Sequence, residues 1–198
     1  MIFLIKHRWW LSLIVTLCCA GATWALGGWR DLATGRWGVQ WQIALGLAGC
    51  ALALAINGVL HEALKQIVGP GYVRRFQRYG RHILDGMGWP AYVAGGLMAA
   101  LAEEPFFRGV LLRAFEQPLI GIAVAALAFA LCHWLRLRYW GFWLWAMWEG
   151  VLFGILLVVT GSLLVVIIAH GLHDVVAYRL FARLVRDREK PHPSASAR

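Results

Sequence analysis

Charged residues are scarce in this chain: Asp, Glu, Lys and Arg make up 15% of its 198 residues, whereas 61% are hydrophobic. A soluble domain is usually about 45–50% apolar, so this composition is typical of a membrane protein. Acidic residues are the scarcest, 10 against 19 Lys and Arg. The basic residues lie between hydrophobic runs and form no single face, and no DNA- or RNA-binding motif is present. We therefore expect no nucleic-acid partner.

The common disulfide, zinc and serine-protease patterns are also missing. The four cysteines lie in apolar segments without CxxC spacing, so they indicate neither a disulfide framework nor a zinc knuckle. An HExxH motif is absent, which removes the usual zincin pattern. Ser12 and Ser162 are isolated from any plausible base, which argues against a serine intramembrane protease.

What the chain does contain is a series of long hydrophobic runs. A helix needs about 20 apolar residues to cross a bilayer, and six runs approach this length: 9–27, 39–60, 89–112, 118–135, 140–160 and 162–182. With the N-terminus inside, 15 Lys and Arg fall on the inner side and three on the outer, as the positive-inside rule requires. The sequence predicts an all-α, polytopic helical bundle in the lipid bilayer, with about six transmembrane helices and both termini cytoplasmic.

Composition also divides the chain. Residues 1–88 hold two runs and a basic segment, too polar to span, that we expect to lie on the inner membrane surface. Residues 89–185 form the core that carries the polar side chains described next, and 186–198 form a polar tail expected to be disordered. Residues 1–26 also resemble a signal peptide. We expect this first run to be retained, because its apolar stretch continues through Trp24 to Leu26.

Eight ionisable side chains interrupt the last four runs: Glu103, Glu104, Arg108, His133, Glu149, His170, His173 and Asp174. Such groups are costly within a span, so they normally face a cavity and carry function. Glu104 and Arg108 are one helical turn apart and can pair. Glu103 points about 100° away, which makes it the better candidate general base. The alternative is that these three charges form a buried ion-pair network that only fixes helix packing.

The histidines follow the same one-turn spacing. His133 comes one turn after Phe129, and Asp174 one turn after His170, where its carboxylate can orient the imidazole. His173 either shares that face or bonds to a neighbouring helix. Glu149 either snorkels or bonds to a neighbouring helix. A carboxylate pair, an arginine and two histidines on separate spans indicate a membrane-embedded hydrolase with a glutamate base.

These residues resemble the motifs of the CPBP intramembrane proteases, the family of CAAX proteases and bacteriocin-processing enzymes also called Abi. The first motif, EExxxR, is similar to Glu103 through Arg108, continuing into Gly109. FxxxH resembles Phe129 through His133, and HxxxN or HxxxD resembles His170 through Asp174. The chain departs from the family in two ways: about eight spans are typical there, and Asn is more usual than Asp at 174.

The resemblance implies a multi-pass bacterial inner-membrane endopeptidase that cleaves membrane-anchored or lipidated substrates with a glutamate-activated water. Its catalytic residues would be Glu103, Glu104, Arg108, His133, His170 and Asp174, the last three binding the carbonyl oxygen or a metal. We favour no metal, with the histidines as oxyanion donors. Zinc or another divalent metal is the alternative, held by Glu103, His133 and His170. The competing functions are a non-catalytic immunity or scaffold protein of the same fold and a proton-coupled transporter.

Overall fold

The computed structural model describes residues 8–29, 32, 35–84, 87–133 and 140–186, and within these ranges all regular structure is helical. Expectations about the tail at 187–198 fall outside the described residues. The order of elements is α2 (Arg8–Leu26), α3 (Val39–Val68), α4 (Pro70–Leu84), α5 (Trp89–Glu104), the π-helix η1 (Pro105–Leu111), the 3₁₀ turn η2 (Leu112–Ala114), α6 (Pro118–Cys132), α7 (Trp140–Thr160) and α8 (Leu163–Arg186).

Three of these helices are long and apolar enough to cross a membrane: Val39–Val68, Trp140–Thr160 and Leu163–Leu184, with hydropathies of 2.2, 1.9 and 1.6. Shorter apolar helices are Thr16–Leu26 and Pro118–Cys132. Two helices extend beyond the hydrophobic runs from which they were predicted. Helix α3 continues to Val68, eight residues beyond the end of its run at 60, and α8 continues to Arg186, past the end of its run at 182. In both cases helical hydrogen bonding does not stop where hydrophobicity does.

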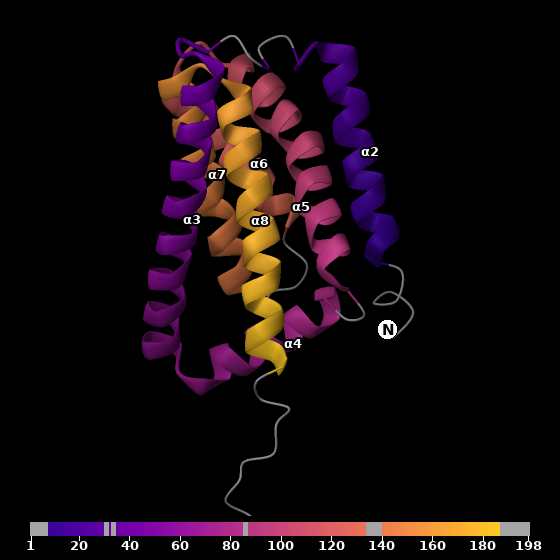
Figure 1. Ribbon diagram of the computed structural model, residues 1–198, viewed down its shortest axis with the longest axis vertical. Coiled ribbons are helices and arrows are strands. Elements are labelled where there is room, and N and C mark those ends of the chain that lie inside the picture. The colour runs from indigo at the N-terminus through magenta and orange to yellow at the C-terminus, as the bar shows by residue number, and fades with distance from the viewer. Residues whose placement is uncertain (1–7, 30–31, 33–34, 85–86, 134–139, 187–198) are drawn as a thin grey trace, which may run out of the picture.

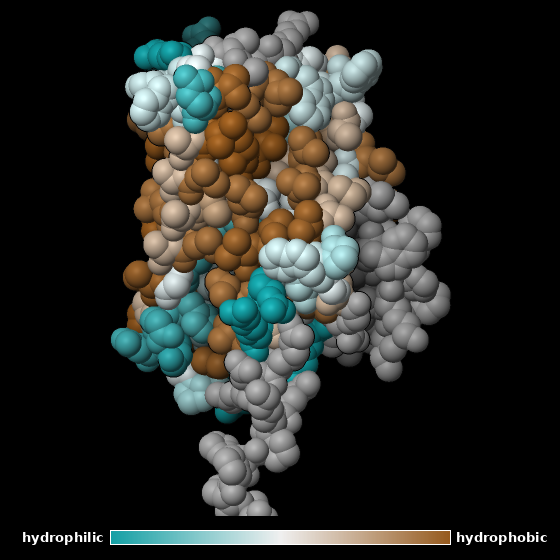
Figure 2. Space-filling view, in the orientation of Figure 1, coloured by the Kyte–Doolittle hydropathy of each residue, from teal (hydrophilic) through white to brown (hydrophobic). Residues whose placement is uncertain are grey.

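The apolar helices form one bundle. In Figure 1, α2, α3, α5, α6, α7 and α8 run along the long axis, and α4 lies across one end. Figure 2 shows apolar side chains over the middle of the visible face and hydrophilic ones towards its two ends. Large apolar side chains on the outside include Trp24, Ile67 and Leu119, each at least 80% exposed. An outer surface of this kind fits lipid and not water, so the protein is an integral membrane protein.

Helix α4 is the basic segment expected at the membrane surface. Its apolar side chains Tyr72, Phe76 and Leu84 are buried against the bundle, whereas Arg74, Arg78 and Arg81 are exposed. The turn from α3 into α4 passes through Gly69 at φ 77°, a left-handed conformation that glycine adopts without a Cβ clash. An amphipathic helix with arginines on its outer face is suited to an interface.

Helix α8 is the central element of the bundle and packs against α3, α5, α7 and α4. Small residues bring its neighbours close: an added Cβ at Gly96 of α5 would lie 2.8 Å from the carbonyl oxygen of Gly171 in α8. Close backbone approach of this kind is the usual way in which helices associate in membranes. It places the polar face of α8 directly against the end of α5, where the two glutamates lie.

Gly109 is the tightest such contact. A Cβ at this position would meet the carbonyl oxygen of Gly28, at the end of α2, at 2.3 Å. We therefore expect Gly109→Ala to push α2 away from η1 and to lower the stability of the detergent-solubilised protein, measured by thermal unfolding. Gly58→Ala is the matched control, because a Cβ there meets nothing within 4 Å. Equal melting temperatures for the two variants would contradict the expectation.

Candidate active site

The six side chains predicted for the site come together inside the bundle. Glu103 and Glu104 end α5, Arg108 lies in η1, His133 caps the C-terminus of α6, and two residues come from α8. The ionisable groups that interact electrostatically with Glu103 are His133, His170, Asp174 and Glu104, and Arg108 interacts with both glutamates. Four separate elements thus supply one polar centre.

A change of helix type positions the two glutamates. Helix α5 ends at Glu104, and Pro105 begins the seven-residue π-helix η1. Proline has no backbone N–H to continue the α-helical hydrogen bonds, and π-helical turns occur frequently at functional sites. On the two sides of this change, Glu104 and Arg108 are completely buried.

Glu104 is held on two sides. Its Oε1 accepts hydrogen bonds from Arg108 Nη1 at 2.9 Å and from His170 Nδ1 at 2.6 Å. Arg108 also donates from Nη2 to the carbonyl oxygen of Gly150 at 3.2 Å, and its Cζ lies 4.7 Å from the centre of the Phe129 ring. The Glu104–Arg108 pair was predicted from spacing. The bond from His170 was not, because it joins helices that are distant in sequence.

Glu103, by comparison, is not held by such bonds. Its side chain makes no hydrogen bond or ion pair with any residue that the structure describes, and its Oε2 is a buried acceptor without a partner. Glu104 Oε2 and Arg108 Nε are also buried and unpartnered. Buried polar atoms normally find a partner, often an ordered water. This corner of the site is therefore suited to bind a water molecule or a polar group of a substrate.

His133 presents one free nitrogen. Its Nδ1 lies 2.8 Å from the carbonyl oxygen of Phe129 and must donate to it, which leaves Nε2 for other contacts. Helix α6, which His133 caps, has only 15 residues and is about 22 Å long, less than the roughly 30 Å of a bilayer core. His133, at the end of this short helix, lies within electrostatic range of Glu103.

His170 lies between two carboxylates. Its Nδ1 faces Glu104 at 2.6 Å and its Nε2 faces Asp174 Oδ2 at 3.5 Å, while its ring stacks on Phe153 with centroids 5.1 Å apart. The predicted contact between His170 and Asp174 is present, but it is longer than the contact between His170 and Glu104. Asp174 Oδ1 lies nearer to His173 Nδ1, at 3.1 Å. His170 can donate to a substrate oxygen only if Nε2 turns away from Asp174.

The comparison with protein families agrees with this geometry. Residues 85–176 match the family model described as type II CAAX prenyl endopeptidase Rce1-like. Over these residues, less than half of the chain, the sequence is similar to the Rce1-like family. The match includes all six candidate site residues, which we call the Rce1-like site from here on, and it confirms the resemblance to the CAAX proteases. Neither a curated protein nor a solved structure gives a significant match to the chain.

The Rce1-like site does not form a ready-made metal centre. Among the described residues, no three His, Cys, Asp or Glu side chains are placed to hold one ion. Of the three alternative ligands, Glu103, His133 and His170, the last has both ring nitrogens directed at carboxylates. The arrangement as it stands thus fits hydrogen bonding better than coordination.

Two further ionisable residues from the sequence analysis lie beside the Rce1-like site. Glu149 and His173 both bond to Asn57 of α3, at 2.6 and 2.8 Å. The sequence analysis did not select Asn57, which lies outside the family match. The signal that could have found it is an amide in the middle of the apolar run "ALALAINGVL".

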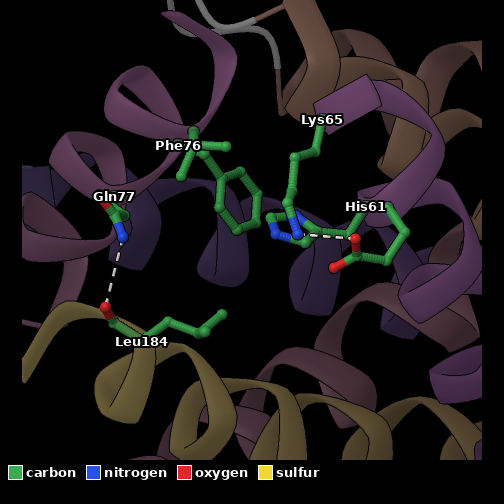
Figure 3. Close-up of a pocket in the computed structure, with 7 residues that line it drawn as sticks. His61, Lys65, Phe76, Gln77 and Leu184 are labelled. Atoms are coloured by element: carbon green, nitrogen blue, oxygen red, sulfur yellow. Dashed lines mark hydrogen bonds and ion pairs between the residues drawn. The ribbon is translucent and has the colours of Figure 1, made fainter. Parts of the chain in front are cut away.

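A pocket of about 300 Å³ lies elsewhere, between the C-terminal part of α3, α4 and the end of α8. Figure 3 shows its residues, with Lys65 paired to Glu62 at 2.7 Å and Gln77 bonded to the carbonyl oxygen of Leu184. None of the six Rce1-like site residues lines this pocket, so it is separate from the site.

Proposed function

We propose that the chain is an intramembrane endopeptidase that hydrolyses peptide bonds of membrane-anchored or lipidated substrates with a water activated by Glu103. One observation carries this proposal. Of two adjacent glutamates, Glu104 is fixed through Oε1 by Arg108 and His170, whereas Glu103 bonds through neither oxygen to any residue that the structure describes, and its Oε2 is buried. A carboxylate that is not neutralised by a fixed partner can accept a proton from water.

The proposed reaction begins with a water held at Glu103 Oε2. Glu103 takes one proton, and the resulting hydroxide forms a bond to the carbonyl carbon of the scissile amide. Glu103 then gives this proton to the amide nitrogen, the C–N bond breaks, and a carboxylic acid and an amine leave. His133 Nε2 is the nitrogen best placed to donate to the oxyanion, because its Nδ1 is already committed to Phe129.

The other residues hold this arrangement. Arg108 balances the charge of Glu104, and the pair fixes the α5–η1 junction from which Glu103 projects. Glu104 in turn orients His170 through Nδ1. Hydrogen-bonded ions of this kind are stable in a low-dielectric interior only when each is paired. In this role Glu104, Arg108 and His170 keep Glu103 in place and do not themselves attack the substrate.

We propose six membrane crossings with both termini on the cytoplasmic side of a bacterial inner membrane. Consecutive long helices alternate in direction, and the start of α2 and the end of α8 point towards the end where α4 lies (Figure 1). That end carries the basic helix α4, as the inner side should. The alternation supports six crossings even though α5 and α6 are short as single α-helices.

The substrate should reach this site from the bilayer. The family description names CAAX prenyl endopeptidases, so a prenylated peptide is one candidate; a bacteriocin leader and a C-terminal sorting tail are others. The test is to incubate the purified protein in liposomes with matched peptides, one lipid-anchored and one soluble. We expect cleavage of the anchored peptide alone. Binding without cleavage would favour the non-catalytic immunity protein, and proton flux without cleavage the transporter.

We also propose that the reaction needs no metal ion. The support is that Glu103 would have to serve as both ligand and base, while Arg108, near both glutamates, would oppose a dication. We expect active, detergent-purified enzyme to contain less than stoichiometric zinc and to keep its activity in a chelator. Metal analysis and activity assays measure both. Loss of activity on chelation with recovery on adding zinc would overturn the proposal.

A further inference from the structure

A second buried polar cluster lies next to the site, and the proposed mechanism does not use it. It consists of Asn57 in α3, Trp148 and Glu149 in α7, and His173 in α8. The exposed fractions of Asn57, Glu149 and His173 are 6%, 9% and 4%. Polar side chains are expensive inside a membrane and usually serve a function there.

The donor and the acceptor of each hydrogen bond in this cluster can be assigned in turn, starting from Trp148. The indole Nε1 of Trp148 can only donate, and it lies 2.8 Å from Asn57 Oδ1, which fixes the orientation of the amide. The amide Nδ2 then donates to Glu149 Oε1 at 2.6 Å and to His173 Nε2 at 2.8 Å. With Nε2 of His173 accepting from this amide, the ring proton of a neutral His173 is on Nδ1; Glu149 Oε1 also lies 3.2 Å from the same Nε2.

This proton is directed at the active site. His173 Nδ1 lies 3.1 Å from Asp174 Oδ1, so it donates to that oxygen. The other oxygen, Oδ2, faces His170 Nε2 at 3.5 Å and accepts from the Tyr178 hydroxyl at 3.4 Å. The order of donors and acceptors in the cluster thus determines which oxygen of Asp174 faces His170.

We propose that Asn57 and Glu149 are positioning residues that act through His173 to orient Asp174 and, through it, His170. The inference rests on the proposed function for its catalytic meaning. Glu149 accepts a hydrogen bond from one N–H of the Asn57 amide, so that the other N–H points at His173. Without the amide, His173 loses the partner that keeps its proton on Nδ1, and Asp174 can turn. Small misplacements of catalytic groups have large effects on rate.

The kinetic test compares Asn57→Leu with Gln42→Leu. Both residues are buried in α3, and Gln42 accepts a hydrogen bond from Ser162, the residue just before α8, away from the site. We expect Asn57→Leu to lower kcat roughly 10- to 100-fold, as loss of outer partners typically does, with little change in KM. Gln42→Leu should keep kcat near that of the wild type. Glu149→Gln, which retains an acceptor for the amide, should lose less activity than Glu149→Leu.

A double-mutant cycle separates positioning from general destabilisation. In an Asp174→Ala background, adding Asn57→Leu should lower kcat no further, because the group that it positions is gone. Losses that multiply in the double variant would overturn the proposal. So would an Asn57→Leu enzyme whose kcat equals that of the wild type.

A second readout does not depend on peptidase activity. In ¹⁵N NMR of the histidine side chains in detergent-solubilised protein, we expect His173 to carry its proton on Nδ1. Asn57→Leu should shift the His173 and His170 resonances, whereas Gln42→Leu should not. Unshifted resonances in Asn57→Leu would overturn the inference. If the wild-type protein cleaves nothing, the proposed function fails, but the NMR result still decides whether the cluster orients these histidines.

Discussion

Glu103→Gln is expected to lower kcat by about 10²- to 10⁴-fold, the range that a general base usually contributes. Glutamine has nearly the same shape, so the α5–η1 junction should be unchanged, but its amide cannot accept a proton from water. Peptide affinity should also stay close to that of the wild type, since the neutral side chain leaves the fixed pair of Glu104 and Arg108 intact. The measurement is kcat on a lipid-anchored peptide, with binding followed separately.

The matched control is Glu116→Gln, which removes one carboxylate from an exposed position between η2 and α6. It should leave kcat unchanged, which shows that loss of acidic charge alone has no effect. A Glu103→Gln protein that cleaves the peptide at the wild-type rate would show that another group activates the water. Thermal unfolding of both variants confirms that activity, and not folding, has been compared.

Arg108→Met should be the most destabilising single change in the site. The substitution leaves Glu104 completely buried without its arginine partner, and breaking a buried ion pair in this way typically costs about 3–5 kcal/mol. The carbonyl oxygen of Gly150 also loses its donor. We expect a large fall in the free energy of unfolding in mixed micelles and, with Glu103 no longer held, loss of peptidase activity.

The double variant Glu104→Gln/Arg108→Met tests whether the unpaired charge causes the loss of stability in Arg108→Met. It removes both charges together, and replacing a whole buried ion pair is often close to neutral. We expect the double variant to recover much of the stability that Arg108→Met loses, without recovering full activity. If it is as unstable as the single variant, the guanidinium contributes through packing on Phe129 and not through its charge.

Properties set by neighbouring residues could be predicted from the sequence. Composition and run length predicted a helical membrane protein, and the four-residue spacing predicted the Glu104–Arg108 pair. The amphipathic character of α4 likewise followed from its order of apolar residues and arginines. Each depends on contacts within about one helical turn, for which the geometry is the same in any fold.

Only the tertiary structure decided how the separate helices meet. The bond from His170 to Glu104 and the cluster around Asn57 join helices that lie far apart in the chain. They depend on the rotation and relative depth of each helix, which small-residue contacts such as that between Gly96 and Gly171 fix. Hydrophobicity does not encode that information, because lipid accepts every apolar face of a helix equally and only close packing and hydrogen bonds distinguish one orientation from another.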